Sequence, residues 1–177
     1  VQMQYLKDRS YTVISMQDLL SFFEQRVKPQ SKSILLTFDD GYDDFFTDAY
    51  PILKEFGYSA TVFIPTGLMN NAGYLYWDKI AEMTGNRILF ANHTWSHKNV
   101  KTKEDVLKME ISTADVQLNE KGLNGPKVFA YPYGLESALT ISFLQGLNYK
   151  LAFTTRHGGT LCKKQILDLP RIRIGNG

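Results

Sequence analysis

The sequence predicts an α/β fold in which parallel strands alternate with helices. Short apolar runs at 33–38, 60–64 and 128–131 are typical of buried strands. Longer segments between them carry apolar residues at helical spacing. This alternation implies parallel strands joined by right-handed crossovers, in either a barrel or an open sheet. In both, functional groups gather at the carboxyl ends of the strands.

The elements are punctuated by capping residues, glycines and prolines. A helix is expected over 16–27 with Ser15 as its N-cap. A second helix over 44–56 should end at Gly57, and Pro51 inside it predicts a kink or a late start. Further helices are predicted at 76–83, 103–121 and 137–144, and further strands at 87–91, 151–154 and 166–174.

Length and composition fit a single globular domain over residues 1–177. Hydrophobic residues make up 44% and charged residues 21%, which excludes a disordered or fibrous chain. The first residues resemble the middle of a domain, so we expect that some N-terminal sequence precedes them.

Charge and cysteine content limit the partners. Twenty Lys and Arg against 18 Asp and Glu leave a net charge of +2, and no basic stripe forms, so nucleic acid is not expected as a partner. No apolar run approaches the roughly 20 residues that span a bilayer. The single cysteine, Cys162, cannot form an internal disulfide. The oligomeric state has no signal in the sequence.

Two histidines, His93 and His97, stand four residues apart after a predicted strand. If this segment is helical, both imidazoles lie on one face and can reach one cation. Two histidines and a carboxylate, with one open position, form a known catalytic zinc set. The alternative is that both histidines only cap a helix and pack in the core, and the spacing alone favours neither.

Adjacent carboxylates, Asp39 and Asp40, end the predicted strand over 33–38. Two like charges held close are costly unless a cation neutralises them. Because successive strand residues point to opposite sides, one carboxylate could bind a metal while the other acts as a base. The alternative is a solvent-facing acidic turn, DDGYDD, shaped by Gly41.

Three ordered motifs, LTFDDGY, NHTWSH and YPYG, resemble the polysaccharide deacetylases with a NodB homology domain, carbohydrate esterase family four. The resemblance runs from about Tyr5 to Ile174. The opening YLKDRSYTVIS and the closing LPRIRI are similar to the poly-β-1,6-N-acetylglucosamine deacetylase branch. The resemblance implies a distorted (β/α) barrel with fewer than eight complete units.

The resemblance also implies residue roles. Asp39 matches the general base, and Asp40, His93 and His97 match the ligands of one divalent metal ion. Zn²⁺ suits this set best, although Co²⁺, Ni²⁺ and Fe²⁺ accept the same ligands. Tyr133 matches the residue whose backbone N–H helps to hold an oxyanion. With Tyr131 and Pro132, it is expected to contact the substrate.

The sequence departs from the family pattern in two places. The late Leu-x-x-His motif that supplies the general acid is absent, and the remaining histidine, His157, is interpreted as a loop residue. Ala130 stands where the family has an arginine that steadies the catalytic aspartate. We hypothesise that Arg171 or Arg173 takes over that contact, while a plain surface position is equally consistent with each.

The function these features imply is metal-dependent removal of N-acetyl groups from an N-acetylglucosamine polysaccharide, outside the cell or at its envelope. Two alternatives stay open. One is a glycan-binding module that keeps the metal site without catalysis, which the missing acid motif favours. The other is a metallohydrolase of small amides, which would prefer these to oligosaccharides.

Overall fold

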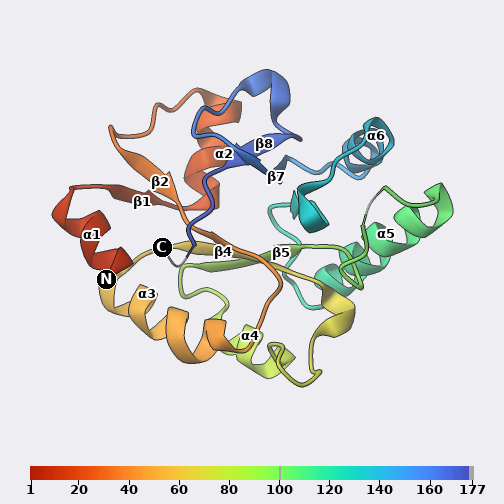
Figure 1. Ribbon diagram of the computed structural model, residues 1–177, viewed down its shortest axis with the longest axis horizontal. Coiled ribbons are helices and arrows are strands. Elements are labelled where there is room, and N and C mark those ends of the chain that lie inside the picture. The colour runs from red at the N-terminus through yellow and green to blue at the C-terminus, as the bar shows by residue number, and fades with distance from the viewer. Residues whose placement is uncertain (100, 176–177) are drawn as a thin grey trace. The chain divides into compact units, whose positions relative to one another are not determined.

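The computed structural model describes residues 1–99 and 101–175. Its main sheet has six strands in the order β3-β4-β5-β6-β7-β8, which is also their order along the chain (Figure 1). The pairs with a recorded register are parallel. Chain order in a parallel sheet is the topology of a (β/α) barrel, and six strands are fewer than eight. The predicted incomplete barrel is therefore confirmed.

The strands of this sheet are short, and helices connect most of them. The strands are β3 (Thr37–Phe38), β4 (Ala60–Ile64), β5 (Ile88–Asn92), β6 (Val128–Ala130), β7 (Leu151–His157) and β8 (Leu169–Arg171). The α-helices are α1 (Gln2–Asp8), α2 (Met16–Gln25), α3 (Tyr50–Phe56), α4 (Trp77–Met83), α5 (Glu104–Glu120) and α6 (Ala138–Gly146). Shorter helical turns are η1 (Phe45–Ala49), η2 (Thr66–Leu68), η3 (Pro132–Gly134) and η4 (Lys163–Gln165).

The described chain divides into two compact units, residues 1–63 with 68–90, and residues 64–67 with 91–175. Strands β4 and β5 each contribute residues to both units. The expectation of a single domain stays a prediction.

The first unit shows where local sequence signals misled. One strand was predicted over 33–38, but Leu36 interrupts it. The first half, β2 (Ser33–Leu35), pairs in parallel with β1 (Thr12–Ile14) in a separate two-stranded sheet. Helix α1 and strand β1 were not predicted, because short elements of this kind carry too few residues for a periodic pattern.

Pro51 shapes the helical segment that follows β3. The segment opens as the π-helical turns of η1, and Pro51 lies in the first turn of α3. A proline at that position has no N–H for an intrahelical bond, and a wider π turn leaves room for its ring. The irregularity predicted from Pro51 is thus present as a π-helical start.

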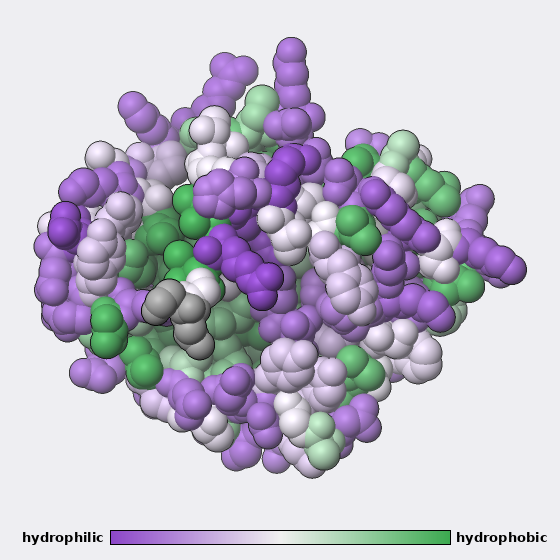
Figure 2. All heavy atoms as spheres, in the orientation of Figure 1, coloured by the Kyte–Doolittle hydropathy of each residue, from purple (hydrophilic) through white to green (hydrophobic). Residues whose placement is uncertain are grey.

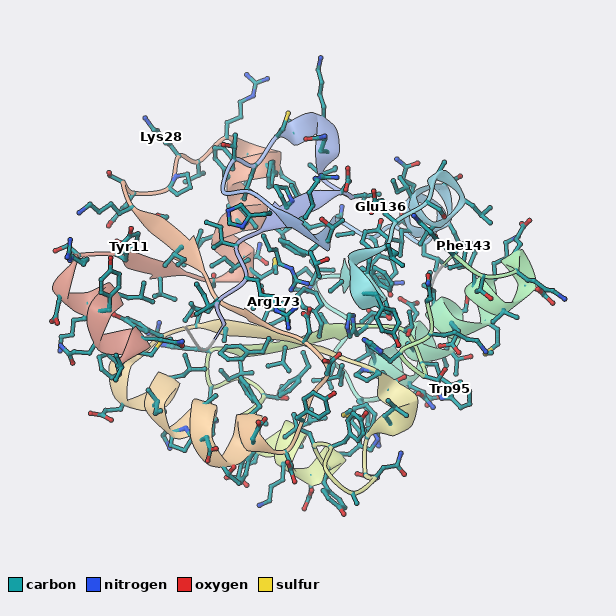
Figure 3. All side chains as sticks on the ribbon, in the orientation of Figure 1. Tyr11, Lys28, Trp95, Glu136, Phe143 and Arg173 are labelled. Carbon is teal, nitrogen blue, oxygen red and sulfur yellow. The ribbon has the colours of Figure 1, made fainter. Side chains whose placement is uncertain are left out.

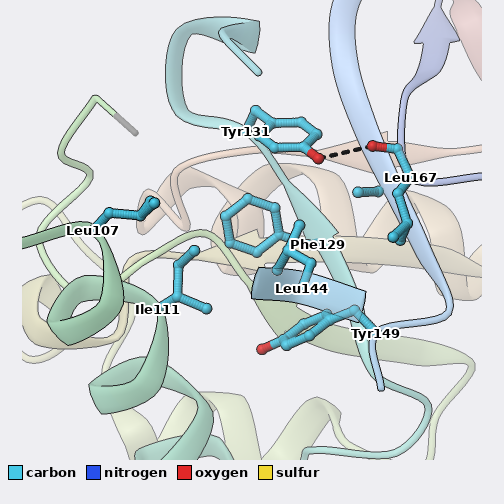
Figure 4. Close-up of a cluster of buried hydrophobic side chains, with 8 residues drawn as sticks. Leu107, Ile111, Phe129, Tyr131, Leu144, Tyr149 and Leu167 are labelled. Carbon is cyan, nitrogen blue, oxygen red and sulfur yellow. Dashed lines mark hydrogen bonds between the residues drawn. The ribbon is translucent and has the colours of Figure 1, made fainter. Parts of the chain in front are cut away.

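The second unit has its own apolar core. Side chains from α5, β6 and α6 and from the segments around β7 pack together, and Figure 4 shows most of them. The cluster comprises Leu107, Ile111, Phe129, Tyr131, Leu144, Tyr149, Ala152 and Leu167. The rings of Phe129 and Tyr131 meet edge to face, with centroids 5.2 Å apart. This core fixes α5 against β6. The two elements thereby form a rigid support for the loops that follow the strands.

The visible surface is largely hydrophilic, with hydrophobic residues gathered in smaller groups (Figure 2). Within the described residues, no helix is both long and apolar enough to cross a bilayer.

Helix α2 begins with the N-cap that was predicted. The Ser15 hydroxyl accepts from the Asp18 N–H at 3.2 Å, and the Asp18 carboxylate accepts from the Ser15 N–H at 2.8 Å. These bonds satisfy donors that the first helical turn leaves open. Hydrogen bonds from the Ser15 hydroxyl, and next from its backbone N–H, lower the pKa of Asp18.

We expect Ser15→Ala to lower the free energy of unfolding by about 1 kcal/mol, measured by urea denaturation at neutral pH. Because the pKa of Asp18 is lower in the folded chain, its contribution is present above the unfolded value of about 3.9. It is lost as the pH falls through the lower folded value, so the difference between the variant and the parent should narrow there. Ser31→Ala, at an exposed turn, is the control and should change stability by less than about 0.5 kcal/mol.

Candidate metal centre

Asp39 and Asp40 lie in a tight turn directly after β3. The strand ends at Phe38, and both aspartates are half-buried. Asp40 and Gly41 have φ angles of 74° and 65°, so the chain reverses at this point. The expectation that the two carboxylates alternate along a strand was therefore wrong, because neither residue is in one. The turn itself places them.

The acidic turn is held by a neighbouring segment of its own unit. The Leu75 N–H donates to the Gly41 carbonyl at 2.8 Å, and the rings of Tyr42 and Tyr74 lie 5.3 Å apart. The charge of Asp40 is the main cause that raises the pKa of the Tyr42 hydroxyl.

His93 and His97 approach each other without a helix. The segment after β5 is irregular, and Thr94 and His97 have φ angles of 69° and 59°. The segment is not helical, so the condition set for bringing the two imidazoles together is not met, yet the two rings lie 4.8 Å apart between centroids. Left-handed backbone at a residue other than glycine costs roughly 1–3 kcal/mol. Surrounding contacts must offset that cost at both residues.

The hydrogen bond of His93 fixes which ring nitrogen carries the proton. His93 is 1% exposed, and its Nδ1 lies 2.7 Å from the Ala130 carbonyl oxygen. A carbonyl can only accept, so we assign the proton to Nδ1. Nε2 is then the ring nitrogen that can act as a metal ligand, as in ligating histidines whose other nitrogen donates a hydrogen bond.

A buried polar chain fixes the start of the His93–His97 loop. The Asn92 side chain accepts from the Thr94 N–H at 2.8 Å and donates to the Tyr149 hydroxyl at 2.6 Å. That hydroxyl donates to Asp115 of α5 at 2.9 Å, and Lys127 pairs with the same carboxylate at 2.8 Å. Burial, and then the Asp115 charge, raises the pKa of Tyr149, which keeps it a donor.

Sequence reasoning missed these supporting residues. Asp115 and Tyr149 lie 34 positions apart, and no local sequence pattern predicts their contact. Glu110, whose oxygens accept from Ser96 of the same loop, was also missed. A signal for Glu110 existed, since it lies in the stripe of α5 that also holds the buried Leu107, Ile111 and Ala114.

The Tyr131-Pro132-Tyr133 segment divides between core and surface. Tyr131 has no exposed surface, and its hydroxyl donates to the Leu167 carbonyl at 2.7 Å (Figure 4). Pro132 is buried as well. The expected substrate contact by these two side chains is therefore corrected to a packing role. Tyr133 is 62% exposed, and its ring centroid lies 4.8 Å from that of His97.

Asp40, His93 and His97 form a group that could hold a metal ion. Their potential ligand atoms all lie within 4.8 Å of one another. Two atoms that bind one Zn²⁺ at about 2.1 Å can be at most about 4.2 Å apart. Binding one ion therefore requires the ligand atoms to move closer together, and the donor set of two imidazoles and one carboxylate suits Zn²⁺.

Other predicted residues have defined places. His157 is exposed and is the last residue of β7, opposite Arg171, so the loop interpretation was wrong about its element. The Arg171 Nε–H donates to the Thr154 carbonyl at 2.8 Å, whereas Arg173 is exposed (Figure 3). Cys162 is an exposed free thiol.

The backbone at Tyr133 depends on the glycine after it. Tyr133 and Gly134 have φ angles of 59° and 70°. A Cβ at Gly134 would collide with the backbone N and the side chain of Thr155. The carbonyl of Tyr133 accepts from the Thr155 hydroxyl at 3.4 Å, so the two segments approach closely.

We expect Gly134→Ala to lower the free energy of unfolding by about 1–3 kcal/mol in urea denaturation, because strain and overlap add. The control is Gly146→Ala at the end of α6, where an added Cβ meets nothing within 4 Å. That variant should be as stable as the parent, or more stable by up to about 1 kcal/mol. Equal stability of both variants would contradict the steric argument.

Comparison with known proteins gives the same family as the motifs. A sequence model described as polysaccharide deacetylase matches residues 26–152. A putative polysaccharide deacetylase YxkH of Bacillus subtilis is 26% identical over 99% of this chain and 63% of its own length. A poly-β-1,6-N-acetyl-D-glucosamine N-deacetylase of Escherichia coli K12 is 24% identical over 99% of this chain. This chain spans only 32% of that relative.

Comparison with a solved structure supports the same family. The Streptococcus pyogenes deacetylase PplD, in complex with acetate, superposes with a TM-score of 0.91 at 33% identity. The match covers 98% of this chain and 78% of that one. With the family model matching more than half of its residues, this chain belongs to the polysaccharide deacetylase family.

Proposed function

We propose that the chain is a metal-dependent hydrolase that removes N-acetyl groups from an N-acetylglucosamine polysaccharide. The observation that carries the proposal is the grouping of Asp40, His93 and His97, whose ligand atoms lie within 4.8 Å. Membership of the polysaccharide deacetylase family supports the reaction class. The name of the Escherichia coli relative supports N-acetylglucosamine polymers as the substrate class.

The reaction adds water to an amide carbonyl and breaks the C–N bond, releasing acetate and an amine. A divalent ion in this group would polarise the carbonyl and lower the pKa of water. His93 would bind through Nε2, since Ala130 holds its Nδ1–H. Asp39, next to the ligand Asp40, would accept the proton that the attacking water loses.

Negative charge develops on the carbonyl oxygen as water attacks. The backbone N–H of Tyr133 would donate to that oxygen, a contribution of about 3–4 kcal/mol for a well-placed donor. The exposed ring of Tyr133 near His97 would contact the sugar that carries the acetyl group. The leaving amine must also gain a proton, and the sequence lacks the family's histidine motif for that step.

The substrate class implies a place of action. Polymers of N-acetylglucosamine lie outside the cell or in its envelope, and we propose that the chain acts there. The missing acid motif favours one second candidate, a module that binds metal and glycan without hydrolysis. A preference for small amides is a third outcome that the same assay detects.

We expect the purified chain to contain about one Zn²⁺ and to release acetate from N-acetylglucosamine oligomers of β-1,6 or β-1,4 linkage. A chelator should abolish release, and Zn²⁺ should restore it. Asp39→Asn should lower the rate at least about 100-fold while metal content stays near one, because it removes a base and keeps the shape.

The matched controls are two histidine variants. His97→Ala should lose the metal, whereas His157→Ala, outside the metal group, should keep it. Metal and glycan binding without acetate release would support the second candidate. Release from small amides but not from oligomers would support the third.

The arginine hypothesis has a test of its own. If Arg171 or Arg173 steadies the base in place of the arginine that Ala130 replaces, Arg→Met at that position should lower the rate about 10-fold or more. Arg171 is the stronger candidate, because it is half-buried and its Nε–H bond to Thr154 holds its guanidinium in place, whereas Arg173 is exposed. Unchanged acetate release in both variants would refute the hypothesis.

A further inference from the structure

Glu110 is a charged residue in a position built for an apolar one. Helix α5 buries one stripe of residues, and Glu110 lies between Leu107 and Ile111 in it. Glu110 is only 2% exposed. Removing a carboxylate from water is unfavourable unless hydrogen bonds compensate it. The buried position therefore requires partners for both carboxylate oxygens.

Both recorded bonds of this carboxylate go to Ser96. Oε2 accepts from the Ser96 backbone N–H at 2.8 Å, and Oε1 accepts from the Ser96 hydroxyl at 2.6 Å. Two bonds from one residue fix the direction of that residue as well as its position. Glu110 thereby holds the backbone immediately before His97.

The Glu110–Ser96 hydrogen bonds lie next to a residue with an unfavourable backbone conformation. His97 has a φ angle of 59°, a conformation that its own side chain disfavours. At the other end of the loop, the Asn92 side chain accepts from the N–H of Thr94, which is the other left-handed residue. Trp95, between these two sets of hydrogen bonds, packs over Gly67, and its carbonyl accepts from the Gly67 N–H at 2.7 Å. Each end of the loop thus has a buried polar anchor.

We infer that Glu110 is a positioning residue for the metal centre, acting through Ser96 to hold His97 in its ligating orientation. The inference rests on the proposed metal site and adds a residue outside the ligand set. Residues that orient metal ligands typically change metal affinity 10–100-fold when they are replaced. Both oxygens of Glu110 accept from Ser96, the residue before His97, so its effect should pass through the loop.

The test measures Zn²⁺ affinity and loop protection together. Glu110→Ala should weaken Zn²⁺ binding at least 10-fold in chelator competition, and Glu110→Gln, which still accepts from the Ser96 N–H, should weaken it less. Glu120→Gln removes the same charge from an exposed position of α5 and should leave the affinity unchanged. In a double-mutant cycle, Ser96→Ala should add little to Glu110→Ala, because Glu110→Ala already removes the bond to the Ser96 hydroxyl.

Amide hydrogen exchange in the metal-free protein keeps this inference separate from the proposed function. In Glu110→Ala, exchange over residues 93–99 should accelerate, with the Ser96 amide affected most, while α5 away from position 110 stays protected. This result stands even if the parent releases no acetate. Parent-like exchange at Ser96, or Zn²⁺ affinity within twofold of the parent in Glu110→Ala, would overturn the inference. Faster exchange throughout α5 would assign Glu110 to helix stability and would also overturn it.

Discussion

Two histidines four residues apart face one cation only if the chain between them forms a helix or a tight turn, and this chain forms the turn. Both Thr94 and His97 adopt left-handed backbone, so the turn is not stable by itself. The carbonyl of Ala130, the side chain of Asn92 and the carboxylate of Glu110 fix it by hydrogen bonds. The conformation of the His93–His97 loop in the candidate metal centre depends on that set of bonds.

Helix α5 joins the core to the centre. Its apolar residues Leu107 and Ile111 pack in the core of the second unit, and from the same helix Glu110 and Asp115 support the loop after β5. Because the helix is fixed by its apolar contacts, the Glu110 and Asp115 carboxylates are held in place before any ligand arrives. A site built this way is preorganised, which is what binding and catalysis gain from a rigid scaffold.

Burying polar groups away from water costs free energy, and hydrogen bonds and an ion pair between these groups offset that cost. Asp115 accepts from Tyr149 and pairs with Lys127, and the Tyr149 hydroxyl in turn accepts from Asn92. A hydrogen-bond network of this kind is stabilising only while each of its polar groups has a partner. Its position under the loop links the stability of the second unit to the geometry of His93 and its neighbours.

The sequence alone predicted the alternating α/β order, the Ser15 cap and the three motifs, because these are local signals of periodicity and spacing. It also singled out Asp40, His93 and His97, whose ligand atoms the structure brings together. It could not predict that 93–97 is a turn, that β2 leaves the main sheet, or that the Tyr131 side chain is buried. Those outcomes depend on partners far away in the chain, such as Glu110 for Ser96, Thr12–Ile14 for β2 and Leu167 for Tyr131. Only the tertiary structure supplies such partners, because hydrogen bonding and burial there override the preferences of the local segment.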